Sequence, residues 1–229
     1  MLDQSSPKGR ILAAALACAA AKSWSDVTLL DIAEGAGLGL ADLRREEAGS
    51  KTAILAALLR AVDDEVLKRA PRRAEGQSAR DQLFDIVMTR FDVLGPYRKA
   101  LQSIHASGAA DLALAGPVLS SMGWMLEAAG IGTDGAGGSL RVTGLAAVYA
   151  SVFRTWLEDD DPGHARTMAA LDRRLRRGES AIRNVEQVTS VVQRLATEGP
   201  AFLRSVLRGR PAPPPPQPQP GEGTPAGTP

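Results

Sequence analysis

Apolar residues recur three or four positions apart along most of the chain, which is the spacing of amphipathic helices. Val, Ile and Thr nowhere alternate with polar residues as they do in strands. The strong helix formers Ala, Leu, Arg and Glu dominate instead. The pattern therefore predicts an all-α protein.

The first part of the chain predicts a helix-turn-helix head over residues 1–49. The first three expected helices cover residues 7–23, 28–35 and 39–47. Gly37 separates the second helix from the third, and a tight turn there requires the positive φ that glycine tolerates. Ser50 is the expected N-cap of the next helix.

Longer helical stripes predict a larger body over residues 50–210, which would carry the ligand site and the dimer contacts. The expected helices cover residues 81–94, 97 onward, 117 onward, 139–158 and 162–177, with further stripes at 182–195 and 201–208. Glycine and proline mark the breaks between them. Residues 211–229 contain nine prolines and no large hydrophobic residue, which predicts a disordered, Pro-rich tail.

Composition narrows the class of protein. The 229 residues carry a formal net charge of +1, so no global field attracts the chain to nucleic acid or to anionic lipid. The single cysteine, Cys18, excludes an internal disulfide and fits a reducing compartment. Lys8 and Arg10 precede an apolar run that resembles a short signal peptide, but the run continues into the helix-turn-helix pattern. No run reaches the roughly 18 apolar residues of a membrane span, so we expect a cytoplasmic protein.

Candidate chemistry is sparse. His105 and His164 lie far apart without a Cys or carboxylate at ligand spacing, so no metal site is predicted. His164 follows Pro162-Gly163 in an acidic loop, where we expect it to be solvated. The acidic run 158–161 lacks the spacing of an EF-hand. No nucleophile stands in a catalytic pattern. The expectation is a protein without enzymatic activity and without a cofactor.

The head resembles that of the TetR transcriptional regulators, mainly through Asp31-Ile32-Ala33 and Ala36-Gly37-Leu38. After Leu43, however, the family's Tyr-x-His-Phe stretch is replaced by Arg44, Arg45, Glu46 and Glu47, and one extra residue precedes Ser50-Lys51. Residues 1–47 hold five basic and seven acidic residues, a balance of −2. A head that neutralises phosphates is normally basic, so we expect weak DNA binding. If the head does bind DNA, the expected contact residues are Thr28, Leu40, Arg44, Arg45 and Lys51.

The body resembles a second family, the coenzyme Q biosynthesis accessory family of the ninth Coq protein. The likeness runs without a gap from residue 145 to 175, through an apolar helix, a short acidic loop and a second helix. It rests on Leu145, Ala146, Ala147, Tyr149, Asp159, Pro162, Thr167, Leu171, Asp172, Arg173 and Arg174. The resemblance implies a dimer of TetR-type fold that binds lipid and helps a membrane-bound hydroxylase of the quinone pathway reach its substrate. Gly135–Gly138 and Met168 depart from the family pattern, which puts the hydroxylase contact in doubt.

Two helices of the body concentrate flexible and aromatic side chains. They predict a pocket for an apolar lipid or quinone-like molecule, lined by Met122, Met125, Tyr149, Phe153 and Trp156. The alternative is that these residues are ordinary core of a helix bundle.

The last predicted helix is amphipathic and basic, which is typical of contact with an anionic membrane surface. The expected contact residues are Phe202, Leu203, Arg204, Val206, Leu207 and Arg208. The competing interpretation packs this helix onto the body or onto a dimer partner. Together these features favour a lipid-binding accessory protein of ubiquinone biosynthesis. The alternative is a TetR-type regulator that binds DNA and responds to a small apolar ligand.

Overall fold

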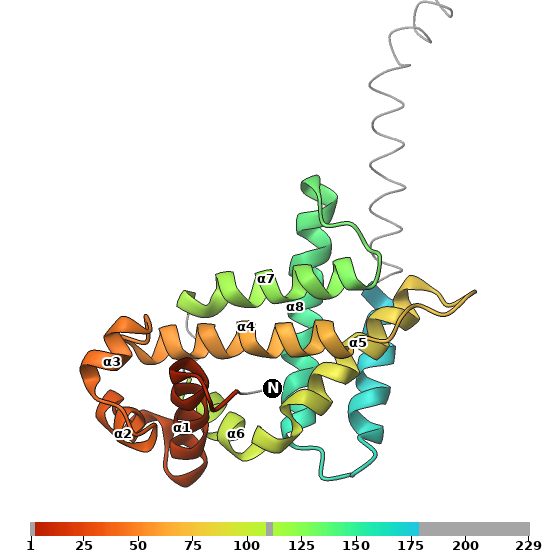
Figure 1. The fold of residues 1–229 in the computed structure, drawn as a ribbon. Helices are drawn as coiled ribbons and strands as arrows, with labels where there is room; N and C mark the ends of the chain where they lie inside the picture. The colour runs from red at the N-terminus through yellow and green to blue at the C-terminus, as the bar shows by residue number, and fades with distance from the viewer. Residues whose placement is uncertain (1–2, 109–111, 179–229) are drawn as a thin grey trace, which may run out of the picture. The chain divides into compact units, whose positions relative to one another are not determined.

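Capping side chains set the boundaries of the head helices. In the computed structural model, which describes residues 3–108 and 112–178, α1 (Pro7–Ala21) begins after the N-cap Ser6 (Figure 1). Proline at the first helical position costs no hydrogen bond, because that N–H has no partner inside the helix. A short 3-10 helix (Trp24–Asp26) then leads to α2 (Leu29–Gly35), α3 (Leu40–Arg45) and α4 (Lys51–Arg69). Gly37 has φ +63°, as the predicted turn requires.

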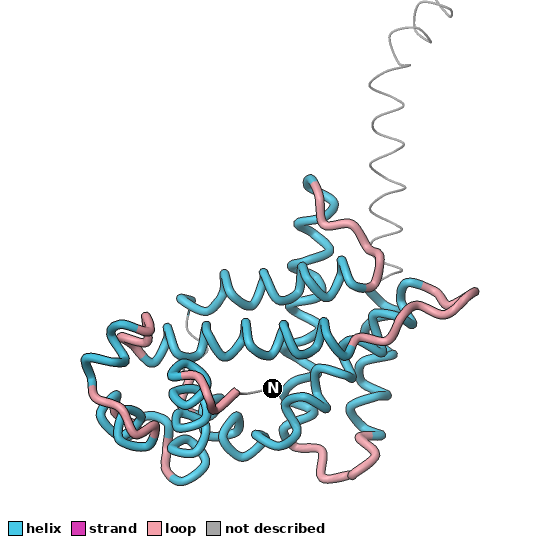
Figure 2. Tube along the Cα trace, in the orientation of Figure 1, coloured by secondary structure: helices cyan, strands magenta, loops and turns pink. Residues whose placement is uncertain are grey.

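The body continues with five more helical segments. They are α5 (Ala79–Leu94), a 3-10 turn (Gly95–Tyr97), α6 (Arg98–Ala106), α7 (Leu112–Ala128) and α8 (Gly135–Leu157). A further helix occupies residues 165–178. Every regular element of the described residues is helical, so the all-α prediction is confirmed (Figure 2). The predicted membrane-contact helix and the Pro-rich tail lie outside the described residues.

Proline and glycine account for the boundaries that the sequence pattern placed wrongly. Pro117 was expected to begin a helix, but it lies inside α7, where the loss of one N–H donor is tolerated. Pro162 lies in a turn, and the next helix begins three residues later at Ala165. Gly135 starts α8 four residues before the predicted start, so residues 135–138, which the pattern left outside any helix, are helical. These residues are therefore weaker boundary markers than the capping side chains.

The core joins head and body through α1 and α4. α1 packs against α2 and α6, while α4 packs against α5 and α7, and α7 packs in turn against α8. α4 and α7 lie side by side and run in the same direction (Figure 1). The largest fully buried apolar side chains come from both parts and include Ile11, Ile32, Ile54, Phe91, Met122 and Trp156. None of the described helices is both long and apolar enough to cross a membrane.

Candidate functional site

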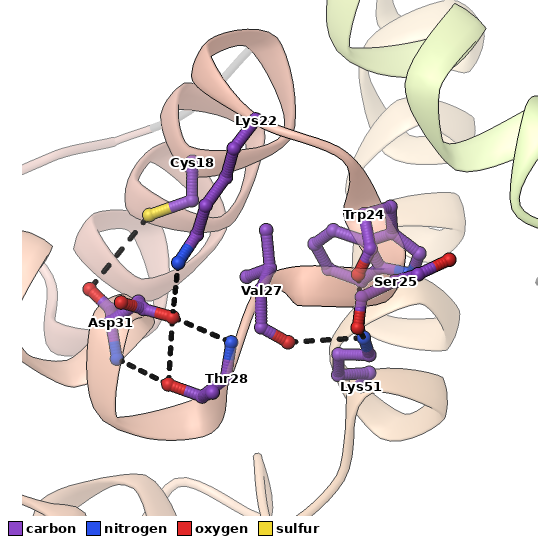
Figure 3. Close-up of polar contacts among 8 residues, drawn as sticks. All are labelled: Cys18, Lys22, Trp24, Ser25, Val27, Thr28, Asp31 and Lys51. Carbon is purple, nitrogen blue, oxygen red and sulfur yellow. Dashed lines mark hydrogen bonds and ion pairs between the residues drawn. The ribbon is translucent and has the colours of Figure 1, made fainter.

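The start of α2 holds Thr28, the first of the candidate DNA contacts. The Thr28 hydroxyl accepts a hydrogen bond from the Asp31 backbone N–H at 3.1 Å and donates to the Asp31 carboxylate at 2.7 Å. The Lys22 ammonium donates to the same carboxylate at 2.8 Å (Figure 3). Lys22, and after it Thr28, hold the pKa of Asp31 well below its usual range. Thr28 therefore serves first as a helix cap, with its hydroxyl directed at its own helix.

Lys51, the second candidate, points into the head. Its ammonium donates to the backbone carbonyl oxygens of Trp24 at 2.6 Å, Val27 at 3.0 Å and Ser25 at 3.4 Å (Figure 3). The same nitrogen lies 5.0 Å from the centre of the Trp24 ring. Lys51 thus closes the turn between α1 and α2, and its ammonium group is bonded to three backbone carbonyl oxygens of the protein.

The remaining candidates lie on the exposed face of α3. Leu40 is 52% exposed, and Arg44 is also exposed. Arg45 pairs with Asp42 one turn earlier on the same helix. Glu47 takes up the extra residue that the sequence places before α4, because it adopts φ +58° in the left-handed region. The face of α3 therefore carries Arg44, which has no ion pair among the described residues, the paired Arg45, the exposed Leu40 and several acidic residues.

The body brings three of the five predicted pocket residues into one aromatic stack. Along α8 the ring centroids of Tyr149 and Phe153 are 5.8 Å apart, and those of Phe153 and Trp156 are 5.6 Å apart. Phe91 of α5 lies 5.6 Å from Tyr149 and 5.3 Å from Trp156. His105 of α6 meets the edge of Phe153 at 6.0 Å. We call these five side chains the aromatic cluster.

Exposure differs within the predicted pocket set. Trp156 and the two methionines of α7, Met122 and Met125, are buried, whereas Tyr149 and Phe153 are half-buried. The cluster is therefore partly exposed at Tyr149 and Phe153 of α8 and exposed at His105 of α6.

A buried polar network borders the aromatic cluster. The Arg90 side chain is 1% exposed, pairs with Asp63 of α4 and donates to the Tyr149 hydroxyl at 3.2 Å. The Ser121 hydroxyl of α7 donates to the other oxygen of Asp63 at 2.6 Å. Burial raises the pKa of the Tyr149 phenol, which therefore stays protonated at neutral pH. A buried charge needs such partners, and this network ties four helices together.

Sequence reasoning found only part of this site. Phe91 stands in the apolar stripe of α5, and that stripe could have identified it as a neighbour of α8. Arg90 gave no signal, since an arginine next to an apolar stripe is normally solvent-exposed. Its burial depends on Asp63, which is 27 residues away in the chain.

The junction between α8 and the following helix is held by Asp159 and Arg98. The buried Asp159 carboxylate accepts hydrogen bonds from Thr167 through its backbone N–H at 2.9 Å and its hydroxyl at 2.6 Å. Burial raises the pKa of Asp159, but these hydrogen bonds outweigh it and leave the pKa below its ordinary value. Arg98 of α6 donates to the Asp159 carbonyl oxygen at 2.6 Å and lies over Trp156 at 4.7 Å.

His164 in the same loop was expected to be solvated, and that expectation is wrong. Its ring nitrogen lies 3.3 Å from the Arg98 guanidinium, and the side chain is half-buried. The left-handed backbone at His164, φ +53°, turns the chain into the helix that follows. Asp161 caps that helix, since its carboxylate accepts from the Ala165 N–H at 2.9 Å.

Two cavities lie along α4, away from the aromatic cluster. The larger has a volume of about 680 Å³ and lies between α1, α4 and α7; the smaller, of about 260 Å³, extends to Glu46 and Glu47 beside α3. Both are lined by Lys8, Leu12, Ala57 and Arg60. None of the five predicted pocket residues lines either cavity. In the described part of the chain, no group of three or more His, Cys, Asp or Glu side chains could hold a metal ion.

Comparison with known proteins gives one family match over part of the chain and several solved structures that share one fold. The COQ9 family model matches residues 141–181, which span most of α8, the Asp159 loop and the helix after it. No curated protein matches the chain.

Solved structures match most of the chain. A TetR transcriptional regulator from Nitrosomonas europaea ATCC 19718 is 24% identical, with a TM-score of 0.58, over 75% of this chain and 97% of its own. One from Rhodococcus sp. RHA1 is 19% identical, with a TM-score of 0.59, over 77% and 97%. A TetR-family regulator from Streptomyces coelicolor is 18% identical, with a TM-score of 0.50, over 88% and 99%.

At these identities the likeness establishes the fold and nothing finer. The helix order, the Gly37 turn and the long α4 connector agree with it. The chain therefore has an all-α, TetR-type fold with a helix-turn-helix head, and its body carries the COQ9 family match over residues 141–181.

Proposed function

We propose that the protein is a non-catalytic accessory protein of ubiquinone biosynthesis that binds an apolar lipid or quinone-like molecule in its helical body. The observation that carries the proposal is the COQ9 match over residues 141–181. The matched segment is also where Asp159 and Arg98 fix α8 against the following helix.

The aromatic cluster is the proposed lipid site. Apolar pockets with a few polar groups suit such ligands, and here the Tyr149 hydroxyl and Arg90 lie at the edge of stacked rings. Tyr149 and Phe153 are half-buried, so a ligand has a route to them from the surface of α8. In this arrangement Met122 and Met125 form the inner wall, where flexible thioethers adapt to an irregular chain.

Lipid extraction from the purified full-length protein tests the site. Mass spectrometry is expected to find a retained apolar lipid, and Phe153→Ala is expected to reduce its amount per protein severalfold. Because Phe153 is half-buried, the variant should lose less than the roughly 3–5 kcal/mol typical of a fully buried phenylalanine. Phe84→Ala is the matched control, since Phe84 is also half-buried, on α5, but outside the aromatic cluster.

Two results would count against a lipid site. One is a wild-type protein that carries no lipid after gentle purification. The other is a Phe153→Ala variant that keeps its lipid and loses the full stability of a core phenylalanine, which would make the cluster plain packing.

The proposed assembly is a homodimer in the cytoplasm with peripheral membrane contact, near a quinone-pathway hydroxylase. Large apolar side chains exposed on the last two described helices support self-association: Leu140 is 47% exposed and Met168 is 37% exposed. Light scattering on the purified protein would measure the mass directly, and a monomer at micromolar concentration would remove the dimer.

A TetR-type regulator that responds to a small apolar ligand is the second candidate. The fully formed helix-turn-helix supports it, as do solved transcriptional regulators aligned over 75–88% of the chain. A nanomolar, sequence-selective complex with DNA from the protein's own upstream region would favour this candidate over the first.

A further inference from the structure

The smaller cavity lies where α1, the end of α3 and the first half of α4 meet. Its volume of about 260 Å³ is just below the ~300–1,000 Å³ of sites for drug-sized molecules, so it suits a smaller ligand. The buried side chains of Ile11, Leu12 and Ile54 form an apolar floor. Charged side chains stand at its two ends, and they decide what the cavity can bind.

The end of α3 supplies the acidic end of the cavity. The Ala48 N–H donates to the Leu43 carbonyl oxygen at 2.8 Å and closes the helix, while Glu47 adopts the left-handed φ of +58°. Glycine is the usual residue at this position of a helix end, because it adopts a positive φ without a steric cost. Here a glutamate occupies the position, and it lines the cavity together with the half-buried Glu46.

Lys8 of α1 and Arg60 of α4 supply the basic end. Both side chains are exposed and line the larger cavity as well, so they lie where the two cavities meet. Ala53, in the first turn of α4, lines only the smaller cavity. Seven residues separate Ala53 from Arg60, which is about 10 Å of helix, so the two ends of the cavity are separated by about that length.

The charges at both ends are available to a ligand. Within the described chain, none of the four side chains forms an ion pair, although two are acidic and two are basic. This agrees with their separation along α4, since opposite charges pair only within about 4 Å. A ligand that carries an ammonium group at one end and an acid at the other would give each end its partner.

We propose that the smaller cavity binds a linear ω-amino acid, a chain of methylene groups with an ammonium group at one end and a carboxylate at the other. Glu46 and Glu47 hold the ammonium group. Lys8 and Arg60 hold the carboxylate, which the planar guanidinium group fits well. The methylene groups lie on the apolar floor, where each buried group adds affinity.

The length of the cavity selects the length of the ligand. Five methylene groups place the end charges roughly 7–8 Å apart, given C–C bonds of about 1.5 Å, and the flexible charged side chains close the remaining gap. The best ligand of the series is therefore close to ε-aminocaproate. The site is separate from the aromatic cluster and does not depend on the function proposed for that cluster.

Calorimetry on the full-length protein measures the binding of γ-aminobutyrate, ε-aminocaproate and ω-aminocaprylate. The affinity is expected to be highest for ε-aminocaproate and lower for the shorter and the longer chain. Norleucine is the matched control ligand, because it is an isomer of ε-aminocaproate with both charges next to one carbon. Norleucine, caproate and hexylamine, which each reach only one end of the cavity, are expected to bind severalfold more weakly.

Two variants separate the two ends. Arg60→Gln is expected to raise the Kd for ε-aminocaproate about fivefold, the scale of an exposed ion pair, and to leave the Kd for hexylamine unchanged. Glu47→Gly is expected to weaken ε-aminocaproate and to leave caproate unchanged. Lys68→Gln is the matched control, because Lys68 is an exposed cation of the same helix outside both cavities.

The melting temperature separates a binding role of Glu47 from a structural one. Glycine suits the left-handed position better than glutamate does, so Glu47→Gly is expected to keep or raise the Tm while it weakens binding. A Tm that falls in this variant, with an unchanged Kd, would make Glu47 a structural residue and contradict the proposal.

Other outcomes would also overturn the proposal. Equal affinity for ε-aminocaproate and norleucine would exclude a ligand that spans the cavity. An affinity that rises with every added methylene group would mean unselective apolar binding. Equal Kd values in Arg60→Gln, Glu47→Gly and Lys68→Gln would exclude the charge contacts, and so would the absence of binding at millimolar ligand. None of these results bears on the lipid site in the body, which is tested by the retained lipid.

Discussion

Lys51 occupies a position where sequence reasoning expects a phosphate contact, yet its ammonium is bonded to the backbone inside the head. Three carbonyl oxygens and the Trp24 ring surround it. A hydrogen bond from a charged donor is stronger than one between neutral groups, and without Lys51 the part-buried Val27 carbonyl would lose the donor that it has here. Lys51 is therefore a structural residue of the head.

Lys51→Met should reveal this role, since methionine keeps the length of the side chain and removes the charge. The free energy of unfolding is expected to fall by about 1.5–3 kcal/mol, measured by urea denaturation. Lys68→Met is the control, with an expected change within about 0.5 kcal/mol because Lys68 is exposed. Equal losses in the two variants would refute the structural role.

Asp159 predicts a dependence of stability on acid. Its pKa in the folded protein lies below the unfolded value of about 3.9, since the Thr167 hydrogen bonds outweigh burial. A carboxyl group of this kind stabilises the fold fully above its unfolded pKa and ceases to do so as the pH falls through its folded pKa. The protein should therefore lose stability below about pH 4, and Asp159→Asn should lose less over the same range. Parallel curves for the two proteins between about pH 5 and 2 would contradict the assignment.

Single residues also mark the limit of what the sequence predicts. Ser50 as a cap and Gly37 as a turn follow from local chemistry, and the structure confirms both. Arg90 is buried against Asp63, and Lys51 is bonded to the Trp24 carbonyl oxygen. Each partner lies 27 residues away in the chain, so no local pattern contains it. The sequence predicted caps and turns, which depend on neighbouring residues, but it did not predict polar pairs between residues distant in the chain.

At the scale of elements, capping residues predicted helix starts better than proline or glycine did. Ser50 was expected to cap α4 and does so, because its hydroxyl accepts a hydrogen bond from the Ala53 N–H. Ser78 caps α5 in the same way, although the pattern placed the start of that helix at residue 81. Pro117 misled the prediction, since a proline is compatible both with a first turn and with a helix that gives up one hydrogen bond. Helix order and face were thus predictable, and boundaries at Pro117 and Pro162 were not.

The helix-turn-helix is expected to bind DNA only weakly. Its face combines acids with an exposed Leu40. Two of its candidate polar contacts are already bonded within the protein, Thr28 to Asp31 and Lys51 to backbone carbonyl oxygens. At physiological salt the Kd for duplex DNA should be no better than about 10⁻⁴–10⁻⁶ M, the non-specific range. A gel shift with the upstream region measures it, and Arg44→Ala should change little. Nanomolar, selective binding that Arg44→Ala weakens would support the regulator instead.

At the scale of the whole molecule, the predicted helix over residues 200–210 is expected to provide membrane contact. Its three arginines contribute about 1 kcal/mol each near an anionic surface, which gives measurable but reversible binding. The full chain should float with anionic liposomes, and a chain without residues 200–210 should not. A chain without residues 211–229 is the control and should float as the full chain does. Equal flotation of all three proteins, or of none, would exclude the helix.

The sharing of α1 and α4 between head and body limits how such a protein can change over time. α1 is packed on α6, the Trp24 N–H donates to Ser103 of α6 at 2.9 Å, and α4 runs from the edge of the head to the buried Asp63. Deleting the head would remove α1 and expose the face of α6 on which it packs. A descendant that no longer used DNA would still have to keep the outline of a DNA-binding domain in order to fold. In chains of this architecture, the shape of the head is therefore a record of folding requirements, and evidence for gene regulation has to come from the charges on its surface.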